Sequence, residues 1–137
     1  MSHNAKYIHI ICTDPRIQKI YHGYLVENNC FGHFDSIQYE NPILDFLNPD
    51  KVGGIIERIK LYQAMHGPDT VALFDHLDCG AYQKNGYVFN DFEHELAVHK
   101  ENNEKVKEII KSNLPDFEVT VKYVAIEKTG ECRWLKG

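Results

Sequence analysis

The chain has 137 residues, of which 43% are hydrophobic and 26% charged, and its formal net charge is −5. This acidic charge balance provides no basic surface for binding nucleic acid or anionic membranes. The longest apolar runs are far shorter than the roughly 20 residues of a membrane span. The N-terminal residues lack a basic region followed by a long apolar stretch, so we expect a cytoplasmic protein. The length predicts a single domain over residues 1–137.

Hydrophobic periodicity predicts alternating strands and helices along the chain. In chain order we predict a strand over residues 6–12, a helix over 16–29, a strand over 34–39, a helix over 52–65, a strand over 70–75, a helix over 92–114 and a strand over 117–126. Pro15 suits the first turn of the first helix, and the third strand is largely apolar on both faces, as a central parallel strand should be. The pattern therefore predicts an α/β fold with a mostly parallel central sheet of about four strands and helices on both faces.

Three potential metal ligands fall at the carboxyl ends of two predicted strands. Cys12 ends the first strand, His76 directly follows the third, and Cys79 lies in the loop beyond. Ligands gather where the carboxyl ends of neighbouring parallel strands diverge, so these side chains converge if the two strands are neighbours. Two thiolates and one imidazole make a tetrahedral zinc site with one open position, which is typical of catalytic zinc. The alternative is that both cysteines are core thiols and His76 is a polar residue at a strand end.

These residues belong to two short motifs. Cys12, Asp14 and Arg16 alternate in the segment CTDPR, whereas His76 and Cys79 stand in HLDCG. The two motifs resemble those of the β-class carbonic anhydrases, which carry Cys-x-Asp-x-Arg after their first strand and His-x-x-Cys-Gly after their third. A weaker likeness extends over the helix around residues 102–110, the strand near 121–126 and the turn at 129–130.

The resemblance implies that Cys12, His76 and Cys79 bind zinc and that Asp14 and Arg16 form the catalytic dyad of the family. A zinc-bound hydroxide would then attack carbon dioxide to give bicarbonate. Asp14 would accept a hydrogen bond from the hydroxide, and Arg16 would keep that carboxylate ionised and off the metal. If Cys12 is left out of consideration, the alternative is that Asp14 is an acid at a helix N-terminus and forms a surface ion pair with Arg16. The resemblance also implies a homodimer or a higher homo-oligomer.

The chain departs from the family pattern in two places. Residues 31–46 lack the Arg-Asn-Ala-Gly-like segment that the family has at its second strand. The family's N-terminal helices, which supply a glutamine to the substrate pocket, have no counterpart in the eleven residues before Cys12. Both departures concern the substrate pocket and the dimer. Two alternatives to carbon dioxide hydration therefore stay open: hydrolysis of carbonyl sulfide or carbon disulfide, and a zinc-binding scaffold without hydratase activity.

Several other residues invite a role that the sequence does not support. Tyr62 lies on the predicted helix before the third strand, near where the family places a pocket aromatic. Cys30 and Cys132 have no spaced partners, so we interpret them as ordinary thiols. Five histidines are interpreted mostly as surface residues, namely His22, His33, His66, His94 and His99.

Overall fold

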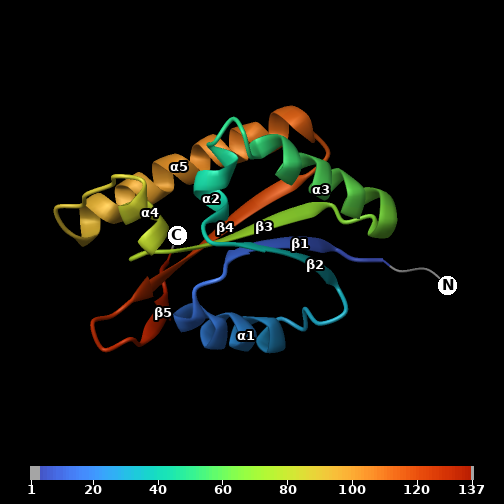
Figure 1. The fold of residues 1–137 in the computed structure, drawn as a ribbon. Coiled ribbons are helices and arrows are strands. Elements are labelled where there is room, and N and C mark those ends of the chain that lie inside the picture. The colour runs from blue at the N-terminus through green and yellow to red at the C-terminus, as the bar shows by residue number, and fades with distance from the viewer. Residues whose placement is uncertain (1–3, 137) are drawn as a thin grey trace.

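The computed structural model of the chain describes residues 4–136 and has a five-stranded sheet at its centre (Figure 1). The strands are β1 Tyr7–Cys12, β2 Phe34–Tyr39, β3 Thr70–His76, β4 Glu118–Ile126 and β5 Cys132–Trp134. Their order in the sheet is β2-β1-β3-β4-β5. The first four strands pair in parallel, and β5 pairs antiparallel with β4.

Helices cover both faces of this sheet. They are α1 Gln18–Glu27, α2 Pro42–Phe46, α3 Val52–His66, α4 Gly80–Lys84 and α5 Phe92–Asn113, and a 3-10 turn over Pro15–Ile17 precedes α1. Figure 1 shows α2, α3 and α5 on one face and α1 on the other. Within residues 4–136, no helix combines the length and the apolar character that crossing a bilayer requires.

The α/β fold with a mostly parallel sheet is confirmed, but the sheet has five strands where the sequence predicted about four. The sequence predicted no strand after residue 126, where the fifth strand, β5, lies. Gly130 takes a left-handed φ of 90° in the turn before it, and the chain then pairs back along β4. The sequence also gave no prediction for α2 and α4. These three elements span only three to five residues, which is too short for hydrophobic periodicity to register.

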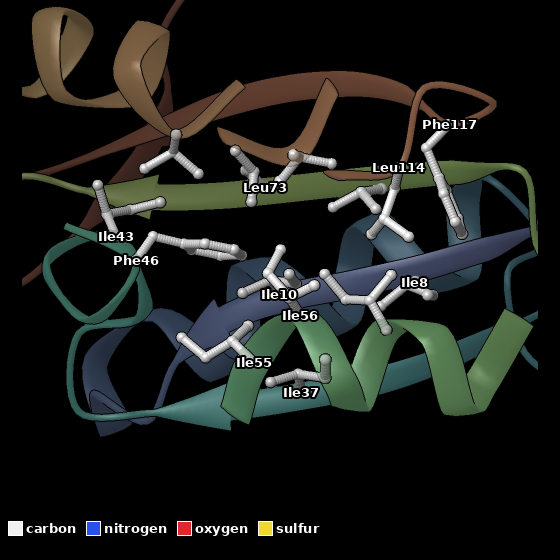
Figure 2. Close-up of a cluster of buried hydrophobic side chains, with 14 residues drawn as sticks. Ile8, Ile10, Ile37, Ile43, Phe46, Ile55, Ile56, Leu73, Leu114 and Phe117 are labelled. Atoms are coloured by element: carbon white, nitrogen blue, oxygen red, sulfur yellow. The ribbon is translucent and has the colours of Figure 1, made fainter. Parts of the chain in front are cut away.

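Each face of the sheet has its own core, because side chains alternate between the faces along every strand. On β1, Ile8 and Ile10 pack toward α3 and α5, whereas Ile11 packs with Tyr21 and Leu25 of α1. Figure 2 shows the first of these clusters, in which branched aliphatic side chains of the strands meet those of the helices. The fold is thus a three-layer arrangement whose middle layer is buried on both sides.

The two central strands bring the predicted site together. β1 and β3 are parallel neighbours, with Tyr7 opposite Thr70 and Ile11 opposite Phe74. The condition under which the candidate ligands converge, that the first and third strands are neighbours, is therefore met. Their carboxyl ends emerge at the same edge of the sheet, and the residues that follow each strand meet there.

Candidate metal centre

The three predicted metal ligands converge at the carboxyl edge of the sheet. Cys12 is the last residue of β1, His76 is the last residue of β3, and Cys79 immediately precedes α4. One ligand atom from each residue lies within 4.8 Å of the other two, and all three residues are buried. The group has the donor atoms and the spacing to hold a metal ion.

The imidazole of His76 is oriented by the backbone. Its Nδ1 lies 2.8 Å from the carbonyl oxygen of Leu77, so Nδ1–H donates there and Nε2 carries the free lone pair. Nε2 is buried and has no hydrogen-bond partner among the described residues. A buried polar nitrogen without a partner calls for an explanation, and metal-binding histidines typically donate their other N–H to a carbonyl. His76 therefore fits a metal ligand that binds through Nε2.

The two thiols lie in a buried environment with hydrogen-bonding groups on several sides. Cys12 Sγ donates to the Glu40 carbonyl oxygen at 2.8 Å, and Asn41 Nδ2 donates to Cys79 Sγ at 3.1 Å. The contact from Cys12, followed by those from His76 and Asn41, lowers the pKa of Cys79 although burial opposes the shift. The contact with Cys79 and burial raise the pKa of Cys12. The surroundings thus favour one thiolate, and the thiolate is the form that binds metals.

Asp14 and Arg16 form a tightly bonded pair beside these ligands. Arg16 Nη2 donates to Asp14 Oδ2 at 2.7 Å, and Nε donates to Oδ1 at 3.1 Å. The Arg16 backbone N–H also donates to Oδ1, at 2.8 Å, because Asp14 caps the 3-10 turn. These bonds lower the pKa of Asp14, so the carboxylate is ionised at neutral pH. Asp14 Oδ2 lies 3.9 Å from the free Nε2 of His76.

The loop between His76 and Cys79 holds the other side of Arg16. Arg16 Nη1 donates to Asp78 Oδ2 at 2.9 Å, and Nη2 donates to the Asp78 carbonyl oxygen at 2.8 Å. Asp78 has a left-handed backbone with φ 56°, which is uncommon for a residue other than glycine. The guanidinium therefore bridges the segments that follow β1 and β3.

The dyad is the part of this group that reaches solvent. The Arg16 side chain is 39% exposed, whereas that of His76 is 1% exposed. Arg16 borders two surface hollows of about 760 and 560 Å³, both of which are also lined by Thr129 and Gly130. The turn between β4 and β5 thus flanks the solvent side of the dyad.

The sequence analysis did not identify the residues that hydrogen-bond to the candidate ligands and to the loop between them. Asn41 contacts Cys79, and Glu95 of α5 accepts a hydrogen bond from the Asp78 backbone N–H at 2.6 Å. The pair Asn41–Pro42 is a helix-start signal that could have located α2. No local signal marks Glu95 as the partner of a loop that precedes it by 17 residues.

The interpretation of one histidine as a surface residue needs correction. His99 was interpreted as a surface residue but is 0% exposed, because it lies on the face of α5 that packs on the sheet. Its Nδ1 lies 2.7 Å from Asp75 Oδ2, and this charged partner compensates for the burial of the imidazole. Tyr62 packs against the core cluster of Figure 2, which includes none of the three candidate ligands. His22 and His33 are exposed, as predicted.

One protein family matches almost the whole chain. A family model described as "Putative carbonic anhydrase" matches residues 2–132. The chain therefore belongs to this carbonic anhydrase family. Among solved structures it is similar to the β-carbonic anhydrase CafA of Aspergillus fumigatus, with 14% identity and a TM-score of 0.42, over 98% of this chain and 76% of that one. None of the curated proteins compared with the chain matches it.

Proposed function

We propose that the chain hydrates carbon dioxide to bicarbonate with a zinc ion held by Cys12, His76 and Cys79. The observation that carries the proposal is the buried Nε2 of His76, which lacks a hydrogen-bond partner among the described residues, in a residue whose ligand atom lies within 4.8 Å of those of Cys12 and Cys79. Two thiols, one imidazole and one open position are the pattern of catalytic zinc. Membership of a carbonic anhydrase family supports the same reaction.

A zinc ion held by these three residues would supply a hydroxide nucleophile at neutral pH, because zinc lowers the pKa of coordinated water to about 7. The task of Asp14 is to accept a hydrogen bond from the attacking oxygen and so aim its lone pair at carbon dioxide. Arg16 keeps the Asp14 carboxylate ionised and bonded on both oxygens, which holds it in place and prevents it from becoming a further metal ligand. Water and carbon dioxide give bicarbonate and one proton, which leaves to solvent.

Metal analysis and stopped-flow hydration test the proposal. The purified protein is expected to contain about one zinc per chain and to accelerate hydration of carbon dioxide, followed with a pH indicator. Asp14→Asn should keep the zinc and lower kcat/KM by about 100-fold or more, since it removes the charged acceptor that orients the attacking oxygen. Asp116→Asn, in the exposed turn after α5, is the matched control and should behave as the wild-type protein does.

The outcomes separate the remaining functions. Protein that holds zinc but does not accelerate hydration between pH 7 and 9 would be a zinc-binding scaffold, and the proposal would be wrong. Consumption of carbonyl sulfide or carbon disulfide by the same preparation, without hydration of carbon dioxide, would assign the site to those substrates instead.

We also infer a homodimer, which is the assembly that the resemblance to β-class carbonic anhydrases implies. β2 is an outer strand of the sheet, and no strand within residues 4–136 pairs with its outer edge. Light scattering on the zinc-loaded protein measures the molar mass directly, and a mass of 15.9 kDa would contradict the inference.

A further inference from the structure

A largely buried ionic group lies directly behind the candidate metal centre. It consists of Asp75 of β3 and of Glu95 and His99 of α5. His99 Nδ1 lies 2.7 Å from Asp75 Oδ2, and its Nε2 lies 3.4 Å from Glu95 Oε2. Burial lowers the pKa of His99, but the two carboxylates outweigh it and raise that pKa to about 9. The imidazole is therefore a cation that links two acidic side chains.

This group accepts hydrogen bonds from the backbone at His76 and in the loop that follows it. On the strand side, Asp75 Oδ1 accepts the His76 backbone N–H at 2.9 Å, while Asp75 Oδ2 accepts from Asn103 of α5 at 2.8 Å. On the loop side, Glu95 Oε2 accepts the Asp78 backbone N–H at 2.6 Å. One helix thus fixes the segment that carries the imidazole at two points.

The contact at Asp78 leads on to the dyad. Asp78 uses both its carbonyl and its carboxylate to bind Arg16, and Arg16 binds Asp14 with three donors. Asp78 also has the left-handed backbone that a residue with a Cβ adopts only when its surroundings hold it there. The short hydrogen bond to Glu95 supplies such a hold. A shift of Asp78 would therefore move the Arg16 guanidinium and, through it, the Asp14 carboxylate.

We propose that Glu95 is a positioning residue: it fixes Asp78, so that Asp78 anchors Arg16 and Arg16 aims the Asp14 carboxylate. The effect on catalysis rests on the proposed function of the dyad, whereas the effect on Asp78 and Arg16 does not. The His99 cation in turn positions the Glu95 carboxylate, because the ion pair between the two side chains draws that carboxylate toward the sheet. If Glu95 served only to stabilise α5, its loss would change stability and leave the Asp78 amide and the Arg16 guanidinium as they are.

The test compares Glu95→Ala, Glu95→Gln and the control Glu93→Gln, an exposed carboxylate on the same helix turn. Glutamine keeps an oxygen that accepts from Asp78 but loses the charge, whereas alanine loses both. NMR on the full chain, with and without zinc, follows hydrogen exchange of the Asp78 amide and the Nε–H signal of Arg16. In Glu95→Ala we expect the Asp78 amide to exchange roughly tenfold faster or more, which corresponds to one lost charge-assisted hydrogen bond.

The same substitution should move the Arg16 signal, with a smaller change in Glu95→Gln and none in Glu93→Gln. In active enzyme, kcat of Glu95→Ala should fall by roughly 10- to 100-fold at unchanged KM, because a misplaced dyad affects chemistry rather than binding. Unchanged Asp78 and Arg16 signals in a folded Glu95→Ala protein would overturn the proposal. A lost Asp78 bond with full kcat would overturn the link to the dyad. A wild-type protein without hydratase activity would refute the proposed function alone, since the NMR readout does not depend on turnover.

Discussion

His9 of β1 shows how the environment of one residue decides its role. It is 1% exposed, and its ring stacks on Phe34 with the centroids 4.5 Å apart. Phe74 meets it edge-on at 4.9 Å, and Nδ1 lies 2.9 Å from the hydroxyl oxygen of Tyr21. Burial lowers the pKa of His9 from 6.5 to about 4. His9 is therefore neutral at physiological pH and serves as a core residue.

This environment predicts that the protein loses stability in mild acid. Between pH 6.5 and about 4 the unfolded chain binds a proton at His9 and the folded chain does not. The free energy of unfolding therefore falls as the pH falls through that range, by up to about 3 kcal/mol from this residue. Below pH 4 both states are protonated, and the contribution changes no further. Urea unfolding at a series of pH values measures the slope.

The matched variants are His9→Asn and His22→Asn. Asparagine at position 9 keeps a polar group for Tyr21 but cannot titrate, so the variant should be less stable at pH 7 and should lose less stability on acidification. His22 is exposed, and its replacement should leave the slope unchanged. Equal slopes in His9→Asn and the wild-type protein would show that other groups cause the acid sensitivity.

At the scale of elements, the short helix α2 connects backbone structure to the metal centre. Asn41 is its N-cap: Oδ1 accepts the Leu44 backbone N–H at 2.9 Å, while Nδ2 donates to Cys79 Sγ at 3.1 Å. The residue is 4% exposed, so both bonds are shielded from water. The start of one helix and the thiol before another are thus held by a single amide.

Two substitutions separate these tasks of Asn41. Serine still caps a helix but is too short to reach Cys79, whereas alanine does neither. We expect both variants to bind zinc about 10- to 100-fold more weakly, as for the loss of other groups that support metal ligands. Only Asn41→Ala should also lose about 1 kcal/mol of stability in the metal-free protein, through the lost cap. Competition with a chromophoric chelator measures zinc affinity, and wild-type affinity in Asn41→Ser would exclude a role for the Asn41–Cys79 bond.

The elements also show what periodicity can predict and where it stops. β2 was predicted with its observed bounds, and α3 and α5 within one residue at each end, because these segments are long enough to show alternation or helical spacing. α2 is only five residues long, and the signal that it does carry is its cap rather than its apolar pattern. β5 depends on pairing with β4, which is a tertiary contact that no local pattern encodes.

At the scale of the whole molecule, the candidate ligands were predictable because they depend on one tertiary relation. Once β1 and β3 are parallel neighbours, Cys12 and His76 must emerge at the same edge. The supporting residues depend on how α2 and α5 pack over the sheet. The sequence places Glu95 and Asn41 on their elements but does not fix the distance from those elements to the loop after β3. The residues that support the candidate ligands could therefore be identified only from the structure.

Zinc at this edge would join parts of the chain that are far apart in sequence, and this predicts that the metal stabilises the whole fold. The three ligands come from the ends of β1 and β3 and from the start of α4. A ligand that binds only the folded state at about 100 times its Kd adds about 2.7 kcal/mol of stability. For a chain of this size that is a rise in Tm of roughly 10 °C. Scanning calorimetry should show this rise with zinc, its reversal by a chelator, and no rise with magnesium, which prefers oxygen ligands.

Two cysteine variants test whether the effect comes from these three ligands. Cys30→Ser, in the core beneath α1, should keep the rise in Tm with zinc, and Cys79→Ser should lose most of it. A Tm that responds to zinc equally in Cys79→Ser would place the metal somewhere other than at these three residues.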